Sequence, residues 1–307
     1  MDEVISQRDV LAPGRLRALS TRRDGPGIVR AAVHGGLLVA GILLASNEAL
    51  PVVLRALALV GAGLLWGLLF GPFHETMHRT AFRSAALNEV VYVLTAVPQL
   101  FTPTGYRAFH FAHHRATHDP ARDPEIAPAP WFLGAWPRSA WVHLLLLTGL
   151  HLLVLKIAML LGMAFGPRPL FEAQMAWLPV SARRRTVWEA RGVLLVWGMV
   201  GWAAWSGATW AIVLWLLQVL GHTVFAPLQM AEHHGLPPDG DVTGRTRSIR
   251  TIAPLRWFFW NMPYHAEHHG WPSVPFHALP ALHAEVAPHL PHREAGYLAI
   301  HLGARRG

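Results

Sequence analysis

Two long apolar runs near the start of the chain predict a pair of membrane spans. They cover residues 28–45 and 52–70. At a helical rise of about 1.5 Å per residue, each can cross most or all of the roughly 30 Å of hydrocarbon in a bilayer. The segment before the first run is rich in arginine, whereas the turn between the runs has no Lys or Arg. Because cytoplasmic loops collect positive charge, we expect residues 1–27 to be a cytoplasmic segment and the turn to lie outside.

A second pair of apolar runs, residues 192–205 and 208–227, predicts another span hairpin with the same orientation. The chain enters it from the basic loop Arg183–Arg185, so we expect this pair also to start and end on the cytoplasmic side. We therefore predict an all-α integral membrane protein with about four transmembrane helices in two hairpins. Residues 28–285 form one membrane domain in this prediction, and residues 286–307 form a C-terminal tail.

The apolar run at residues 140–165 does not fit a simple crossing. Arg138 precedes it and Arg168 follows it, and both resemble cytoplasmic flanks. A single crossing would place one of these arginines outside, against the usual charge asymmetry. We therefore expect this run to lie in the membrane plane or to re-enter. The shorter run at residues 87–100 predicts another in-plane segment.

Composition agrees with a membrane protein and narrows its partners. Of the 307 residues, 52% are hydrophobic and 14% are charged, against about 25% charged in a soluble globular domain. The net charge of +8 does not indicate nucleic acid, because the arginines flank apolar runs. The chain has no cysteine, and so it can form no disulfide, iron–sulfur cluster or thiolate-ligated haem of its own. Any electrons that it needs must come from an external donor.

Histidines carry the strongest chemical signal. The chain has 20 of them, and many fall in four short segments beside the predicted cytoplasmic ends of apolar runs. On a helix, residues three and four apart share a face, so each segment can direct its imidazoles to one place. We call three of the segments box 1, box 2 and box 3 in chain order, and the fourth follows the last span. In sequence order they are HETMH (His74–His78), HFAHH (His110–His114), EHH (Glu232–His234) and HAEHH (His265–His269).

This number of imidazoles predicts a site for two metal ions in a cytoplasmic, histidine-rich cap. Imidazole binds iron, zinc and copper, but one zinc needs only three or four ligands. The eight histidines of the three boxes, with one more near His233, suffice for two ions with open positions, and two such irons can activate dioxygen. Nearby carboxylates can accept a hydrogen bond from the second ring nitrogen of a ligand. The candidates are Glu75, Asp119, Asp123, Glu125 and Glu267.

Two other readings of the histidines are open. HETMH alone is also the signature of a zinc metalloprotease, with Glu75 as the general base, but that reading leaves the two HxxHH boxes unexplained. A membrane metal carrier without enzymatic activity would need ionisable residues along a path through its spans. The candidate residues instead gather at one end of the spans.

The three boxes resemble those of the membrane fatty acid desaturases. The resemblance runs over residues 74–283 and rests on HETMH, HFAHHRATHDPARDPE and NMPYHAEHHGWPSVPFHALPALH. It implies two span hairpins that carry a cytoplasmic cap with two irons. With O2 and two electrons, such a centre removes two hydrogens from an acyl chain. The metal ligands that the resemblance implies are His74, His78, His110, His113, His114, His265, His268 and His269.

The same resemblance implies a ninth ligand after the last span, for which we choose His233 over its neighbour His234. In some relatives, an asparagine one turn before this histidine reaches the metal through water, and Gln229 holds the matching position here. Asn261 is a second candidate for that role. A cytochrome b5 domain is fused to some relatives, and we expect none in this chain. Electrons would then come from a separate ferredoxin or cytochrome-type donor.

The resemblance leaves the substrate and product open. We expect a lipid or acyl substrate, and a location in a bacterial inner (plasma) membrane with the active site facing the cytoplasm. Related enzymes with similar boxes hydroxylate alkanes, oxidise carotenoids or desaturate small natural-product intermediates. The alternative to an acyl desaturase is therefore a diiron hydroxylase or monooxygenase of an alkane, a terpenoid or a small natural-product intermediate.

Overall fold

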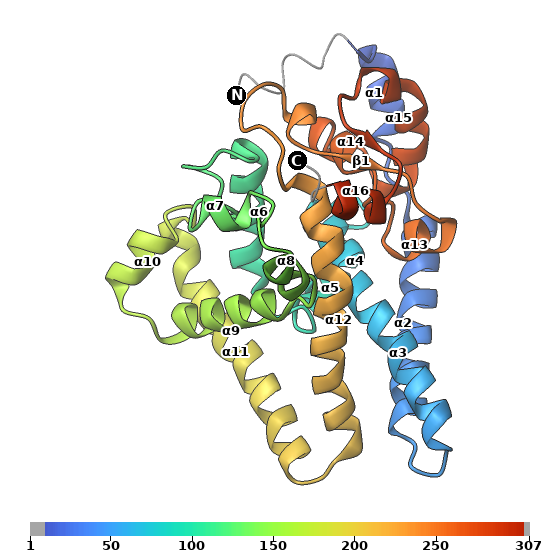
Figure 1. Ribbon diagram of the computed structural model, residues 1–307, viewed down its shortest axis with the longest axis vertical. Coiled ribbons are helices and arrows are strands. Elements are labelled where there is room, and N and C mark those ends of the chain that lie inside the picture. The colour runs from blue at the N-terminus through green and yellow to red at the C-terminus, as the bar shows by residue number, and fades with distance from the viewer. Residues whose placement is uncertain (1–9, 304–307) are drawn as a thin grey trace.

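The computed structural model describes residues 10–303, and these are mostly helical. Four long helices form two hairpins that extend from one cap (Figure 1). The first hairpin consists of α2 (Asp24–Ser46) and α3 (Val52–Leu68), and the second of α11 (Val180–Trp205) and α12 (Thr209–His233). Helix α12 also packs along α3 and so joins the two hairpins.

Three helical segments are long and apolar enough to cross a membrane. They are α2, α12 and the stretch Val52–Met77, in which α3 continues into α4 (Phe70–Met77). The predicted span in α11 differs from this pattern. Its first half carries Arg183–Arg185, Glu189 and Arg191, so only the part from residue 192 onward is apolar. The chain is an all-α integral membrane protein, but α11 enters its hairpin as a partly polar helix.

Residues 140–165 form two helices rather than one. Helix α8 (Ala140–Leu147) and helix α9 (Leu150–Phe165) meet at a bend of 60° and together could count as one broken span. Gly149 makes the bend with a φ of 68°, and a Cβ there would lie 2.1 Å from the carbonyl oxygen of His222. Only glycine fits this close approach. In Figure 1, α9 runs across the long helices, as expected of an in-plane or re-entrant segment.

The other short apolar run also forms its own helix, α5 (Ala85–Ala96). Ser84 caps it by accepting a hydrogen bond from the N–H of Leu87. The remaining elements form the cap and its connections. Its helices are α1 (Pro13–Leu19), α6 (Pro103–Ala116), α7 (Pro130–Leu133), α10 (Arg168–Gln174), α13 (Ala253–Phe258), α14 (His265–Gly270), α15 (Leu279–Val286) and α16 (Tyr297–Gly303). The short elements are η1 (Val242–Gly244), η2 (Phe276–Ala278), η3 (Ala287–His289), β1 (Ser248–Ile249) and β2 (Arg293–Glu294).

Both ends of the described chain, which belong to the predicted N-terminal segment and C-terminal tail, pack in the cap. Within the predicted N-terminal segment, Leu11 and Leu19 are buried in one cluster with Trp271 of the cap. Within the predicted tail, β2 pairs in parallel with β1, and α16 packs on α12. These contacts arise from segments far apart in sequence, so local hydrophobic patterns did not reveal them.

A layer of aromatic side chains joins the spans to the cap. Phe70 and Phe73 from α4 pack against Tyr106 of α6 and Phe225 of α12. Burying an aromatic side chain of this size contributes roughly 1.5–3 kcal/mol. Below this layer, α3 and α12 approach closely, because a Cβ at Gly67 would lie 2.6 Å from a backbone oxygen of α12. Small residues commonly permit such contacts between membrane helices. The aromatic layer and the contact between α3 and α12 together fix the position of α4, and therefore of box 1, relative to the spans.

Candidate metal centre

The histidine boxes stand at helix ends that meet inside the cap. Box 1 lies at the end of α4, box 2 in the last half of α6, and box 3 fills most of α14. His233 is the last residue of α12. Of the nine predicted ligands, only His78 and His114 are half-buried, and the others are buried. Imidazoles removed from water in this number need partners, since a buried polar group without one is costly.

Five of the predicted ligands form a first group, defined by His74, His78, His110, His114 and His268. Their ligand atoms lie within 4.8 Å of one another. The Nε2 atom of His110 is 3.1 Å from Nε2 of His78 and 2.9 Å from Nε2 of His114. His114 Nε2 is in turn 3.2 Å from His268 Nε2. Three boxes, from α4, α6 and α14, thus contribute to this group.

The other four predicted ligands form a second group. His113, His233 and His269 have ligand atoms within 4.8 Å of one another. His265 joins them, because its Nε2 atom is 2.9 Å from Nε2 of His233 and 3.1 Å from Nε2 of His269. The two groups touch where the rings of His114 and His269 stack at a centroid distance of 4.2 Å. Both groups therefore belong to one centre.

The HxxHH spacing divides box 2 and box 3 between the two groups. In α6, His110 and His114 face the first group and His113 faces the second. In α14 the roles are exchanged, since His265 and His269 contact the second group while His268 belongs to the first. Residues four apart lie nearly in line along a helix, but neighbouring residues differ by about 100°. One HxxHH helix can therefore serve two adjacent sites at once.

The short distances between ring nitrogens are those expected of a centre that binds cations. A neutral imidazole has one N–H, so His265 Nε2 can donate to His233 or to His269, but not to both. The remaining short contact would then have no proton for a hydrogen bond, unless a cation lies between the nitrogens. Two nitrogens bound at about 2.1 Å to one ion and 90° apart are about 3.0 Å from each other. The observed separations of 2.9–3.2 Å agree with this arrangement.

Ring nitrogens without hydrogen-bond partners and lowered histidine pKa values also indicate a metal-binding centre. Among the described residues, the buried Nδ1 and Nε2 atoms of His74 have no hydrogen-bond partner. Burial, and then the neighbouring histidines, lower the pKa values of five box histidines well below their usual range. The five are His110, His114, His265, His268 and His269. These rings are neutral at pH 7, which is the form that binds metal.

His113 is the exception, because two predicted carboxylates surround it. Its Nδ1 atom lies 2.9 Å from Asp123 Oδ2 and 3.8 Å from Glu125 Oε2. Burial lowers the pKa of His113, but the charges of Asp123 and Glu125 outweigh burial and raise the pKa to about 9. Nδ1–H thus donates to Asp123, and a metal would bind at Nε2 by displacing the second proton of the ring. Gln229, one turn before His233, is a hydrogen-bond partner of Glu125.

The other predicted supporting residues behave differently. Glu75 Oε1 lies between the Nδ1 atoms of His74 and His268, at 3.6 and 3.7 Å. Glu267 faces the other way and accepts hydrogen bonds from Ser248 and His283. The reason is that α14 uses its other positions for the metal groups, so position 267 faces the C-terminal part of the cap.

Asn261 and Asp119 also have other partners. The amide of Asn261 donates to the carbonyl oxygen of Phe276 at 2.7 Å, within a turn where Asn261 has a φ of 63°. Its side chain therefore stabilises the loop before box 3, and a contact to a metal through water stays a prediction. Asp119 pairs at the surface with Arg122, at 2.7 Å.

Glu232 is the site residue that sequence reasoning missed. Its Oε2 atom lies 3.6 Å from Nε2 of His265, and both residues are buried. The available signal was a carboxylate at the end of an apolar span, since ionisable residues at membrane depth usually have a functional partner. Its neighbours confirm the geometry of the helix end, where His233 enters the second group and His234 packs on Trp136 at 5.6 Å.

Hydrogen bonds from the other ring nitrogen also orient two more ligands of the second group, His233 and His269. His233 Nδ1 donates to the carbonyl oxygen of Arg245 at 2.9 Å, and His269 Nδ1 lies 3.2 Å from the hydroxyl of Thr117. These bonds select the ring nitrogen that is left for a metal. Neither Arg245 nor Thr117 stands out in the sequence, because backbone carbonyls and hydroxyls of any loop could serve.

Fold and site together define a helical integral membrane protein with a buried histidine centre that can hold metal. Residues 49–301 match the fatty acid desaturase family. This range covers most of the chain, and the chain belongs to that family. The sequence-based resemblance to membrane fatty acid desaturases is thereby confirmed.

Two curated relatives show the chemistry of the family. One is a Delta(8)-fatty-acid desaturase of Euglena gracilis, 25% identical over 69% of this chain and 56% of the relative. The other is an alkane 1-monooxygenase of Acinetobacter baylyi, 25% identical over 79% of this chain and 55% of the relative. The chain thus spans about half the length of each relative. Both relatives are oxidoreductases by name, one a desaturase and the other a monooxygenase.

Proposed function

We propose that the nine histidines hold two iron ions and that the chain is an O2-dependent oxidoreductase that desaturates an acyl chain. The observation that carries this proposal is the division of nine histidines into groups of five and four within one buried centre. One ion could use neither all nine nitrogens nor both groups. Imidazole ligands suit iron, and membership of the fatty acid desaturase family supports that metal.

Bound iron would supply the oxidising chemistry by activating O2, and the chain's own residues would bind and shield it. The histidines of the first group bind one ion and those of the second group bind the other. Asp123 holds the Nδ1 proton of His113 and so keeps Nε2 directed at the metal. The aromatic layer under the first group, where the ring of Tyr106 stacks on His110 at 5.5 Å, excludes water from that side.

A narrow apolar cavity supports an acyl or other apolar substrate. It has a volume of about 50 Å³ and lies between α6, α9 and the loop that contains Phe101. Tyr106 lines this cavity and also contacts His110, so the cavity approaches the first histidine group from the membrane side. Apart from Thr102 and Lys156, its lining residues are apolar or aromatic, so a hydrocarbon segment placed there would contact mostly apolar atoms.

The proposal also includes an electron donor and the side of the membrane on which the cap lies. Two electrons would come from a separate ferredoxin or cytochrome-type protein, because the chain has no cysteine for a cluster of its own. We propose a bacterial inner membrane location with the cap in the cytoplasm, from the arginine distribution described above. The substrate would then reach the centre from the lipid phase, and the donor would dock from the cytoplasm.

A hydroxylase is the second candidate. The alkane 1-monooxygenase relative aligns over more of this chain than the desaturase does. The two outcomes start with the same loss of a hydrogen from the substrate, and they differ in whether a second hydrogen leaves or oxygen is added. The zinc protease reading is weaker, since it gives the four histidines of the second group no role.

The metal content and the product test the proposal directly. We expect about two irons per chain in the purified protein, and an alkene product when lipid extracts are compared by mass spectrometry with and without expression. His113→Ala and His268→Ala, one from each group, should both abolish the product while the protein still inserts into the membrane. One zinc per chain with no iron would favour the protease, and an alcohol product would favour the hydroxylase.

A further inference from the structure

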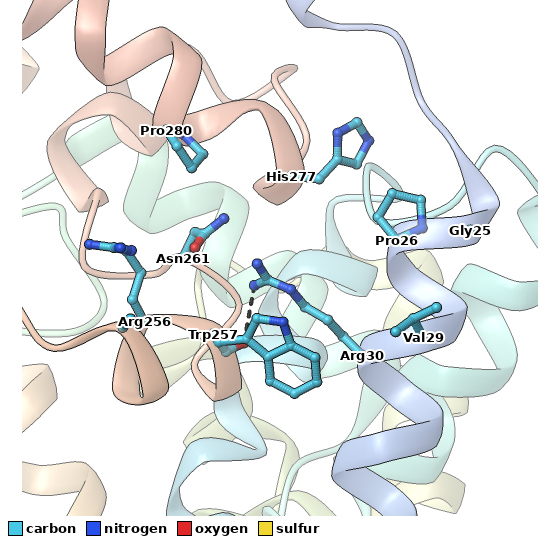
Figure 2. A pocket seen from close by; sticks show the side chains of 10 residues that line it. Gly25, Pro26, Val29, Arg30, Arg256, Trp257, Asn261, His277 and Pro280 are labelled. Atoms are coloured by element: carbon cyan, nitrogen blue, oxygen red, sulfur yellow. Dashed lines mark hydrogen bonds between the residues drawn. The ribbon is translucent and has the colours of Figure 1, made fainter.

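A larger cavity lies on another side of the cap, where the start of α2 meets α13 (Figure 2). Its volume is about 470 Å³. Two arginines line it, Arg30 from α2 and Arg256 from α13, together with Trp257, Asn261 and His277. In the view of Figure 2, the guanidinium groups of the two arginines lie on either side of Asn261. None of the residues proposed as metal ligands lines the cavity.

Arg30 is held in place by aromatic rings rather than by an acid. Its guanidinium lies 5.4 Å from the ring of Trp257 and 4.8 Å from the ring of Phe276. One nitrogen donates to the carbonyl oxygen of Trp257 at 3.0 Å. A guanidinium has five N–H donors, so this arrangement fixes the group and leaves donors for a ligand.

The lining of the cavity is positively charged and has no counter-charge. Among the described residues, neither Arg30 nor Arg256 forms an ion pair, and no Asp or Glu lines the cavity. Because both guanidinium groups line this one cavity, their like charges repel each other across it. Glu75 also acts on Arg30, but it is buried behind the Phe276 backbone, whose N–H it accepts. An anion in the cavity would relieve this repulsion.

His277 adds a further polar atom. Its Nε2 atom is buried and has no hydrogen-bond partner among the described residues. Burial, and then the charges of Arg23 and Arg30, lower the pKa of His277, so the ring is neutral at pH 7 and can donate one hydrogen bond. The cavity therefore offers donors from three side chains, which suits the oxygens of a phosphate.

The rim of the cavity indicates where the phosphate comes from. Val29, which lines the cavity, is 57% exposed. Ile28 and Ile252, the chain neighbours of the lining residues Val29 and Ala253, are 48% and 68% exposed. These side chains lie at the cap end of a helix that is long and apolar enough to cross a membrane. A soluble phosphate compound would leave them in water, whereas lipid acyl chains would cover them.

We propose that this cavity binds the phosphate of an anionic phospholipid between Arg30 and Arg256. The phosphodiester lies between the two guanidinium groups, and its acyl chains run down the exposed apolar face of α2. A zwitterionic headgroup binds less well, because its ammonium group would enter a cavity that already holds two positive charges. Basic pockets beside membrane helices are known to select anionic headgroups in this way.

Lipid binding to the purified, delipidated protein tests this proposal. Phosphatidylglycerol is added in detergent, and bound lipid is measured by native mass spectrometry together with the shift in melting temperature. Arg256→Gln should weaken binding about 10-fold, and the double variant with Arg30→Gln about 100-fold, if each lost charged contact contributes about 1.4 kcal/mol, which is a tenfold change in affinity. Arg256 makes no side-chain hydrogen bond in the described structure, so its variant should fold normally. Arg55→Gln, in the first hairpin but far from the cap, is the matched control and should bind as the wild type does.

Four outcomes would overturn the proposal. The first is equal binding of phosphatidylglycerol by the wild type and the double variant, and the second is equal loss in Arg55→Gln. The third is saturation by inorganic phosphate with no added effect of phosphatidylglycerol, which would show a site for a soluble anion. Equal affinity for phosphatidylcholine would remove the selectivity and overturn the anionic assignment. The assay needs neither iron nor turnover, so its result is independent of the proposed oxidoreductase activity.

Discussion

Replacing Asp123 by asparagine offers a sharp test of how the second histidine group is supported. Asp123 Oδ2 accepts the N–H of His118 at 2.7 Å, and Oδ1 accepts the N–H of Glu125 at 2.9 Å. Both oxygens also lie within 3.0 Å of His113 Nδ1. Asparagine has one oxygen and one NH2 group, so in either orientation its NH2 would face a backbone N–H.

The cost follows from this geometry. Asp123→Asn loses a buried hydrogen bond to a charged acceptor, worth about 1.5–3 kcal/mol, and it removes the anion that orients His113. Changing such a supporting partner typically lowers metal affinity by about 10–100-fold. We therefore expect Asp123→Asn to release iron to a competing chelator at a concentration about 10–100-fold lower than the wild type requires.

Asp119→Asn is the matched control, because Asp119 lies in the same loop but pairs with Arg122 at the surface. Exposed ion pairs contribute about 0–1 kcal/mol, and this one touches no box histidine. We expect its iron retention to equal that of the wild type. If Asp123→Asn held iron as well as the wild type, or if both variants lost it equally, the support assigned to Asp123 would be wrong.

Three further predictions use other parts of the molecule. His233→Ala should lose iron and activity, whereas His234→Ala should keep substantial activity, because only His233 enters a histidine group. Gly149→Ala should destabilise the protein by roughly 2–5 kcal/mol, from a positive φ and a clash with a backbone oxygen, and its melting temperature should fall clearly below that of Gly207→Ala, which has a φ of 88° but open space. For sidedness, a membrane-impermeant thiol reagent should react in intact cells with a cysteine at Ser46 and only after lysis with cysteines at Ser20, Ser181 and Gly303.

Each of these has a clear contrary result. If His234→Ala lost activity while His233→Ala kept normal activity, His234 would be the ligand and the assignment of His233 would be wrong. Equal melting temperatures for the two glycine variants would mean that the bend between α8 and α9 can relax. Labelling of Ser181→Cys from outside, with Ser20→Cys protected, would make residues 140–165 a true crossing and would invert the second hairpin. A centre that joins His233 to the first two boxes could not then form.

The sequence predicted the parts of this protein that depend on local spacing. Apolar runs located both hairpins, because the length and apolar composition of a single segment are enough to predict a membrane span. The HxxHH and HxxxH patterns located the histidines of the centre, because helical periodicity alone sets them on common faces. The choice of His233 over His234 had another basis, the resemblance to a family.

Features that depend on contacts between distant segments could not be predicted. The division of boxes 2 and 3 between the two groups required the relative rotation of α6 and α14, which no local pattern encodes. Glu232 reaches His265 only because the ends of α12 and α14 meet. The pairing of β2 with β1 makes the predicted tail part of the cap, and it involves two residues in each strand, too few for a periodic signal.

The shared boxes have a consequence for how iron would enter. Because α6 and α14 each contribute to both groups, a rotation of either helix that improves one set of nitrogens also moves the other set. The first ion to bind would therefore fix both helices and prepare the second site, without any contact between the ions. Loading would be cooperative, with metal-free and fully loaded chains outnumbering half-loaded ones during titration with iron. Native mass spectrometry would see this as two dominant masses rather than three.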